Sequence, residues 1–170
     1  MAYLEEPPKT VTDARELLLG YVDAYRDAAR RKVAELPEGE LYARRLPSGW
    51  TPLELIKHLT HMERRWFEWG FAGVAVPDPV GDEDPATGRW RVGPDETLAS
   101  VLAMLDAVGA RTRSIVAGAS LADVAAVTGR FAGRQPPTLG WILCHVLQEY
   151  ARHLGHLDVV IELGGGPIGE

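Results

Sequence analysis

The sequence has little cysteine and no long hydrophobic run. Its single cysteine, Cys144, excludes a disulfide framework and a metal site built from several thiolates. No segment approaches the roughly 18 consecutive apolar residues that a membrane span requires, so we expect no membrane partner. The N-terminal stretch MAYLEEPPKT lacks a basic start followed by an apolar run, so we expect no signal peptide. These absences and a single reduced thiol favour a cytoplasmic protein.

A uniform basic charge is also missing. With 18 basic and 24 acidic residues the formal net charge is −6, whereas contacts to phosphate supply much of the affinity for nucleic acids. Three pairs of adjacent arginines are more typical of solvated helix faces than of a binding site: Arg30-Arg31, Arg44-Arg45 and Arg64-Arg65. We therefore expect no nucleic-acid partner. At 170 residues, with 46% hydrophobic and 25% charged residues, the chain predicts one globular domain over residues 1–170.

Apolar residues recur with helical periodicity in four stretches, and segments rich in Gly, Pro and Asp separate them. The expected helices cover residues 12–36, 51–71, 95–117 and 138–163. The second has the clearest start, because Thr51 is a suitable N-cap, Pro52 occupies the first helical position and Glu54 completes a capping box. No stretch alternates apolar and polar residues between hairpin turns, so strands are not expected. The pattern predicts an all-α protein, a four-helix bundle.

The connection between the second and third helices is long, from Val74 to Asp95, and it contains four prolines. Loops of this length in a small domain tend to be functional or mobile. We expect Trp90, within this loop, to pack back over the core or over a pocket.

The five histidines fall in only two short stretches of the chain. On the last helix, at about 100° per residue, an arc of roughly 80° holds His145, Glu149, His153 and His156, with apolar residues beside them. Residues four apart on a helix lie about 6 Å apart, so Glu149 and His153 are close enough to hold one ion. The remaining two histidines belong to the second helix. Of these, His58 lies at the edge of the apolar face, whereas His61 is rotated further and is expected to face solvent.

A carboxylate at position 149 is costly to bury unless a cation neutralises it. One hypothesis is a salt bridge or hydrogen-bond network, with Arg65 or Arg152 as the countercharge. The other is a divalent metal ion bound by His58, Glu149 and His153, a set of two histidines and one carboxylate that is typical of open, reactive sites. The spacing of the residues leaves both hypotheses open.

Neighbouring residues on the last helix have weaker signals. One turn before Glu149, His145 is either a residue that orients a ligand or a histidine of the core or of an interface. One turn after His153, His156 is a candidate general acid or base, and equally a partly exposed residue near the helix end. The expected role of Cys144, rotated about 100° from this strip, is that of a small buried hydrophobic residue. Three further side chains suit either pocket walls or core packing: Trp66, Trp69 and Tyr150.

The motifs Gly49-Trp50-Thr51-Pro52 and Lys57-His58-Leu59, together with the segment from His145 to His156, resemble the DinB-like (YfiT-like) four-helix-bundle metalloproteins, in particular an uncharacterised actinobacterial branch. The resemblance spans essentially the whole chain. It implies an up-down-down-up bundle with long connections, and a divalent metal ion bound by His58, Glu149 and His153. Many members have histidine in place of Glu149. A carboxylate there is similar to mycothiol-dependent maleylpyruvate isomerase, which implies zinc as the first expectation, with nickel, iron or manganese as alternatives.

The resemblance implies a metal-dependent enzyme that activates a low-molecular-weight thiol or water to attack a small-molecule electrophile, as a thiol transferase or a hydrolase. In that role His156 is the candidate catalytic residue. A second hypothesis is a non-catalytic binding or stress-response protein with a structural or vestigial metal site. A third is that the chain works as a homodimer, with apolar helix faces buried between the two copies.

Overall fold

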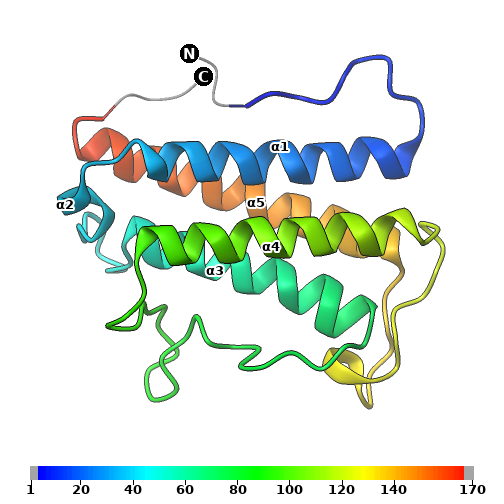
Figure 1. Ribbon diagram of the computed structural model, residues 1–170. Coiled ribbons are helices and arrows are strands. Elements are labelled where there is room, and N and C mark those ends of the chain that lie inside the picture. The colour runs from blue at the N-terminus through cyan, green and yellow to red at the C-terminus, as the bar shows by residue number, and fades with distance from the viewer. Residues whose placement is uncertain (1–3, 167–170) are drawn as a thin grey trace.

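A computed structural model describes residues 4–166, which form a bundle of four long helices. The first and fourth of these helices run in one direction and the second and third in the other (Figure 1), so the arrangement is up-down-down-up, as expected. The only β-structure in residues 4–166 consists of two isolated bridges. In chain order the helices are α1 (Ala14–Ala34), α2 (Glu38–Leu41), α3 (Pro52–Arg64), the π-helix η1 (Arg65–Phe71), α4 (Leu98–Ala117), the 3₁₀-helix η2 (Gly129–Phe131) and α5 (Leu139–Leu163).

Side-chain caps set where the long helices begin. The capping box between Thr51 and Glu54 is present at the start of α3, as predicted. The third long helix begins later than expected, because Thr97 is its N-cap. The backbone N–H of each of Thr97 and Ser100 donates to the side-chain oxygen of the other, and Asp95 therefore lies before the helix. The other two long helices have single caps: Asp13 for α1, one residue after the expected Thr12, and Thr138 for α5.

The apolar stripes of the four helices pack into one core, and a polar group lies inside it. The Glu63 side chain, 0% exposed, accepts two hydrogen bonds from Arg26, at 2.9 and 2.7 Å, and one from the Tyr150 hydroxyl at 2.6 Å. These residues come from α3, α1 and α5, so the network joins three of the four long helices. Tyr150, a candidate pocket wall, is thus a completely buried core residue.

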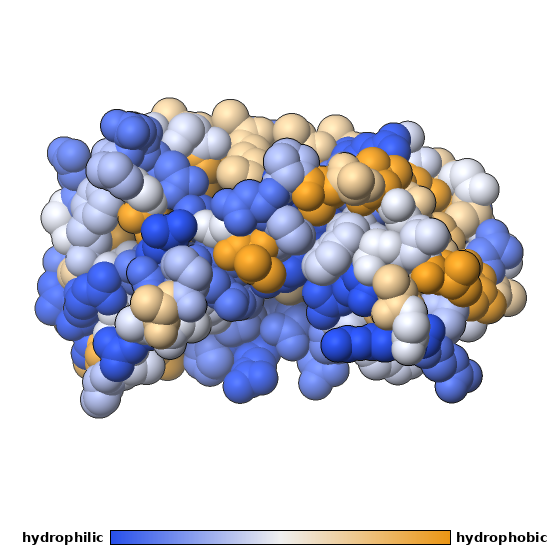
Figure 2. Space-filling model, turned by 90° about the horizontal axis from the view of Figure 1, so that it is seen from below, coloured by the Kyte–Doolittle hydropathy of each residue, from blue (hydrophilic) through white to orange (hydrophobic). Residues whose placement is uncertain are grey.

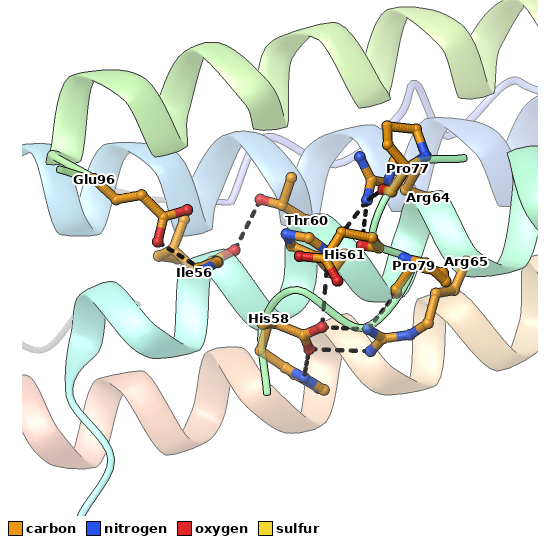
Figure 3. Close-up of polar contacts among 12 residues, drawn as sticks. Ile56, His58, Thr60, His61, Arg64, Arg65, Pro77, Pro79 and Glu96 are labelled. Carbon is orange, nitrogen blue, oxygen red and sulfur yellow. Dashed lines mark hydrogen bonds and ion pairs between the residues drawn. The ribbon is translucent and has the colours of Figure 1, made fainter. Parts of the chain in front are cut away.

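The long loop after η1 runs along the outside of α3, at the bottom of Figure 1. Two arginines fasten it: the Arg64 guanidinium donates to the Pro77 and Asp78 carbonyls at 2.8 Å, and Arg65 donates to the Pro79 carbonyl at 3.2 Å (Figure 3). Because the loop covers this side of α3, His61 is only 4% exposed. The prediction that His61 faces solvent was wrong, since helical rotation alone could not show what the loop covers.

The face that carries this loop is mostly hydrophilic, and its apolar residues form separate patches (Figure 2). Among the helices that the structure describes, none is both long enough and apolar enough to cross a membrane.

Candidate metal centre

The structure brings together the three side chains that the sequence singles out as metal ligands. One donor atom each of His58, Glu149 and His153 lies within 4.8 Å of the others. The His153 Nε2 atom is 3.3 Å from the Glu149 carboxylate, and the two histidine rings have centroids 5.2 Å apart. The candidate ligands come from the adjacent helices α3 and α5. The arrangement is a compact set of two nitrogens and one carboxylate.

A buried carboxylate that the sequence did not single out lies behind His58. The Nδ1 atom of His58 is 2.9 Å from Oδ2 of Asp82, which is 0% exposed and is also bonded by Arg65 (Figure 3). Burial raises the pKa of Asp82, but the bonds from His58 and Arg65 outweigh it and lower the pKa to about 2. An ionised carboxylate on Nδ1 fixes the histidine tautomer and leaves Nε2 for a ligand, as second partners of metal-binding histidines do.

Glu149 has no cationic side chain of arginine or lysine to neutralise it within the part of the chain that is described. Its ion-pair partners within 4.0 Å there are His145, at 3.9 Å, and His153. Arg65, one of the two countercharges considered, pairs with Asp82 instead. A divalent cation would supply the missing charge.

The state of His153 also fits a ligand. Burial, followed by the proximity of His58, lowers the pKa of His153 to about 4, against the opposing effect of Glu149. The imidazole is therefore neutral near pH 7, the form that coordinates metal ions. Two imidazoles and one carboxylate suit a divalent ion such as zinc, and three protein ligands leave a coordination position for a water or a substrate.

Aromatic rings enclose the centre on the side of the long loop. The Trp90 ring stacks on His58 with centroids 4.1 Å apart and meets the His153 ring at 5.4 Å. The expected return of Trp90 is thus confirmed, since it packs against the core and also lines a cleft. Trp50 lies next to it, at 6.2 Å, and also faces His156 at 6.5 Å. Beyond these two indoles a cleft of about 620 Å³ opens to solvent, and its walls include Trp50 and Trp90 but not the three candidate ligands.

The two histidines that flank the ligands on α5 lie in different surroundings. His156 is exposed, and its Nδ1 atom is 3.5 Å from Nδ1 of His153. His145 contacts two indoles: its ring is stacked on Trp141 with centroids 5.0 Å apart, and its centroid is 4.4 Å from that of Trp66. Thus His156 combines solvent access with proximity to the ligands, whereas His145 is part of an aromatic cluster.

The expectation for Cys144 was wrong, because this residue is exposed. The rotation that separates it from the histidine strip carries it onto the outer side of α5. There it lines a shallow groove with Tyr21 and Tyr25 of α1.

Comparison with known proteins identifies the chain. The sequence model of the family described as Mycothiol-S-transferase matches residues 17–166. The chain belongs to this family. The match includes all three candidate ligands, Asp82 and His156. No match was found among curated proteins.

The fold of this member of the mycothiol-S-transferase family is similar to that of a solved structure described in the words "YfiT from Bacillus subtilis is a probable metal-dependent hydrolase with an unusual four-helix bundle topology". The TM-score is 0.66 and the identity 13%, and the alignment covers 96% of this chain and 95% of that one. The DinB-like and YfiT-like resemblance of the sequence is thereby confirmed at the level of the fold.

Proposed function

We propose that this protein is a metal-dependent thiol transferase, which binds zinc through His58, Glu149 and His153 and attaches mycothiol, through its sulfur, to a small-molecule electrophile. The observation that carries the proposal is the convergence of three donor atoms within 4.8 Å in a chain of the mycothiol-S-transferase family. Zinc suits two nitrogens and a carboxylate, although nickel, iron and manganese accept the same donors.

When bound at this position, a divalent cation lowers the pKa of a thiol or of water and so favours the nucleophilic form near neutral pH. The chain supplies the remaining functions. Asp82 holds His58 in one orientation, and Trp90 covers the two histidine rings and restricts the access of water.

His156 is the proposed proton acceptor. It is exposed and lies next to His153, so it can take the proton of the thiol and release it to solvent. The sulfur then forms a bond to the electrophilic carbon with its lone pair. The bond from that carbon to its leaving group breaks, and the leaving group departs with the electron pair.

The cleft beside Trp50 and Trp90 supports a polar thiol as the first substrate. Its walls carry Arg44 and Arg89 as well as the two indoles. Charged and hydroxyl side chains around aromatic surfaces suit a polar molecule that must be oriented over the metal centre.

The test is the metal content of protein purified without a histidine tag. We expect about one divalent ion per chain, and a loss of that ion in His58→Ala, Glu149→Ala and His153→Ala. Glu162→Ala, an exposed carboxylate change on the same helix, is the matched control and should retain the metal. His156→Ala should also retain it but lose thiol transfer by about 10²-fold or more. If the three ligand variants keep the wild-type metal content, the site assignment is wrong.

A hydrolase is the second candidate, because the solved structure of similar fold is described as a probable metal-dependent hydrolase. Both reactions use the same centre, and they differ in the nucleophile. Turnover that requires mycothiol supports transfer, whereas turnover without any thiol supports hydrolysis. Metal-loaded protein that is inactive in both assays would favour the non-catalytic binding protein.

A further inference from the structure

The face of α5 that carries the metal ligands continues into an aromatic surface. Trp141, His145, Glu149 and His153 follow one another at intervals of four residues and therefore lie along one side of the helix. The Trp141 and His145 rings are nearly parallel, at 8°, with centroids 5.0 Å apart. The other end of His145, its Nε2 atom, is 3.9 Å from Glu149. His145 thus links the metal ligands to Trp141 by direct contact.

Trp141 belongs to the wall of a groove of about 480 Å³. The other aromatic members are Trp66 of η1, with its ring 5.5 Å from that of Trp141, and Phe131 of η2, 6.0 Å from Trp66. Pro136 and Pro137 complete the apolar part of the wall, and no charged side chain lines the groove in the described part of the chain. This groove is therefore chemically different from the cleft beside Trp50 and Trp90, which contains several arginines.

Trp141 leaves part of its ring open to a ligand. The residue is 51% exposed although its ring is stacked on His145 and also contacts Trp66. The remaining side of Trp66 is not free, since the Arg130 guanidinium lies 4.2 Å from its ring centre. A large aromatic ring that is fixed from behind and open in front is a stacking platform for a planar apolar group.

We propose that this groove binds a planar, apolar group of the electrophile that receives the sulfur. The inference rests on the proposed function and extends it to the second substrate: the polar cleft accepts the thiol, and the aromatic groove accepts the electrophile. Trp141 precedes Glu149 by two helical turns, about 12 Å along the axis. The group held in the groove is therefore remote from the reacting carbon, and the preferred electrophile is an extended molecule.

Direct binding tests the groove without any reaction. The ligand is an unreactive naphthyl succinimide with a spacer of about 10 Å between the two groups, and its affinity is measured by calorimetry on metal-loaded protein and again after chelation. Cys144→Ser serves as the background, because this exposed thiol would otherwise react with the electrophiles of the activity assay. We expect Trp141→Ala to weaken binding about tenfold and Trp141→Phe, which keeps a ring, to weaken it less. Tyr42→Ala, an aromatic side chain of similar exposure at the end of α2, should leave affinity unchanged.

Activity gives the second readout. With an iodoacetamide that carries the same naphthyl group and spacer as the electrophile, Trp141→Ala should raise KM about tenfold with little change in kcat, and it should leave turnover of the compact iodoacetamide unchanged. Equal effects on both electrophiles, or a ligand affinity within twofold of the wild type, would overturn the proposal. A wild-type dimer that Trp141→Ala dissociates in sedimentation would also overturn it, because a second copy would then occupy the groove. A third outcome separates the two proposals. If Trp141→Ala loses naphthyl binding but the wild type shows no thiol turnover, the groove is a binding site for planar apolar groups and the protein is not a thiol transferase.

Discussion

The Nδ1–H group of His58 donates to a carboxylate, Asp82, that is completely buried and lies 24 residues further along the chain. Because Arg65 bonds to both oxygens of the same carboxylate, Asp82 is held on two sides. The orientation of a proposed metal ligand therefore depends on a loop as well as on its own helix.

Replacing Asp82 with Asn should weaken metal binding about 10–100-fold, because the amide makes His58 a weaker ligand and leaves Arg65 unpaired. Competition with a chelator of known affinity measures this change. Asp95→Asn is the matched control, since it makes the same change at an exposed position of the same loop. A metal affinity equal to that of Asp95→Asn would show that Asp82 does not tune the ligand.

The stability of the metal-free protein should fall as the pH is lowered from about 6.5 toward 4. Burial is the main cause that lowers the pKa of His61 and of His153 to about 4, against an ordinary value of 6.5. In this window the unfolded chain binds protons that the folded chain does not, so acid favours unfolding. Each histidine contributes a slope of at most about 1.4 kcal/mol per pH unit.

Urea unfolding at pH 7.5, 6.0 and 5.0 measures that slope. Above pH 6.5 the contribution is fully present, so the stability should level off there. His61→Gln should make the slope between pH 6.0 and 5.0 shallower, because only His153 then remains of the two. A stability that does not change over this range would contradict the buried, neutral state of both rings.

Glu63→Gln should destabilise the fold by about 3 kcal/mol, since it leaves the buried Arg26 without its main countercharge. For a chain of this size that corresponds to a fall in Tm of about 6–12 °C, which thermal denaturation can measure. The exposed pair of Arg30 and Asp106 is the control, because Asp106→Asn should cost less than about 1 kcal/mol. Equal costs for the two changes would mean that burial does not strengthen the inner pair.

Two glycines near the aromatic groove allow the cost of a steric clash to be measured apart from the cost of a positive φ. Both have positive φ, 58° at Gly129 and 72° at Gly133. A Cβ at Gly129 would lie 2.4 Å from the Trp69 carbonyl oxygen, whereas one at Gly133 would meet nothing within 4 Å. Gly133→Ala should cost about 1 kcal/mol and Gly129→Ala about 2–4 kcal/mol in urea unfolding. Similar costs would indicate that the backbone near Gly129 can move away.

The fold could be predicted from the sequence where local signals are strong. Thr51, Pro52 and Glu54 mark a helix start by chemistry that acts within four residues, and the structure has the same capping box. The start of α4 was placed too early, near Asp95 and Glu96; the Glu96 side chain bonds to Lys57 and to the backbone of Gly93, before the helix begins. That contact depends on tertiary structure, which periodicity does not contain.

The residues of the candidate site also include some that local spacing predicts and others that depend on tertiary structure. Helical spacing could place Glu149 and His153 on one face, because both belong to α5. Asp82 could not be found in this way: it is one of several acidic residues in an irregular loop, and nothing in its neighbours shows that it meets His58. The same loop explains why His61 is buried. The sequence did indicate that this loop is important, because it is long and rich in proline and because Trp90 was expected to pack over the core or a pocket. It did not indicate that Asp82 is the residue that meets His58.

The order of the ligands along the chain has a consequence for biosynthesis. One proposed ligand lies in α3, in the first half of the sequence, and the other two lie in α5, the last helix. A nascent chain on the ribosome that has not yet reached Glu149 carries only His58 of the three and has no partner helix to set against it. Loading of the proposed site therefore requires translation of the last helix, because a prematurely terminated chain that lacks α5 has only one of the three proposed ligands.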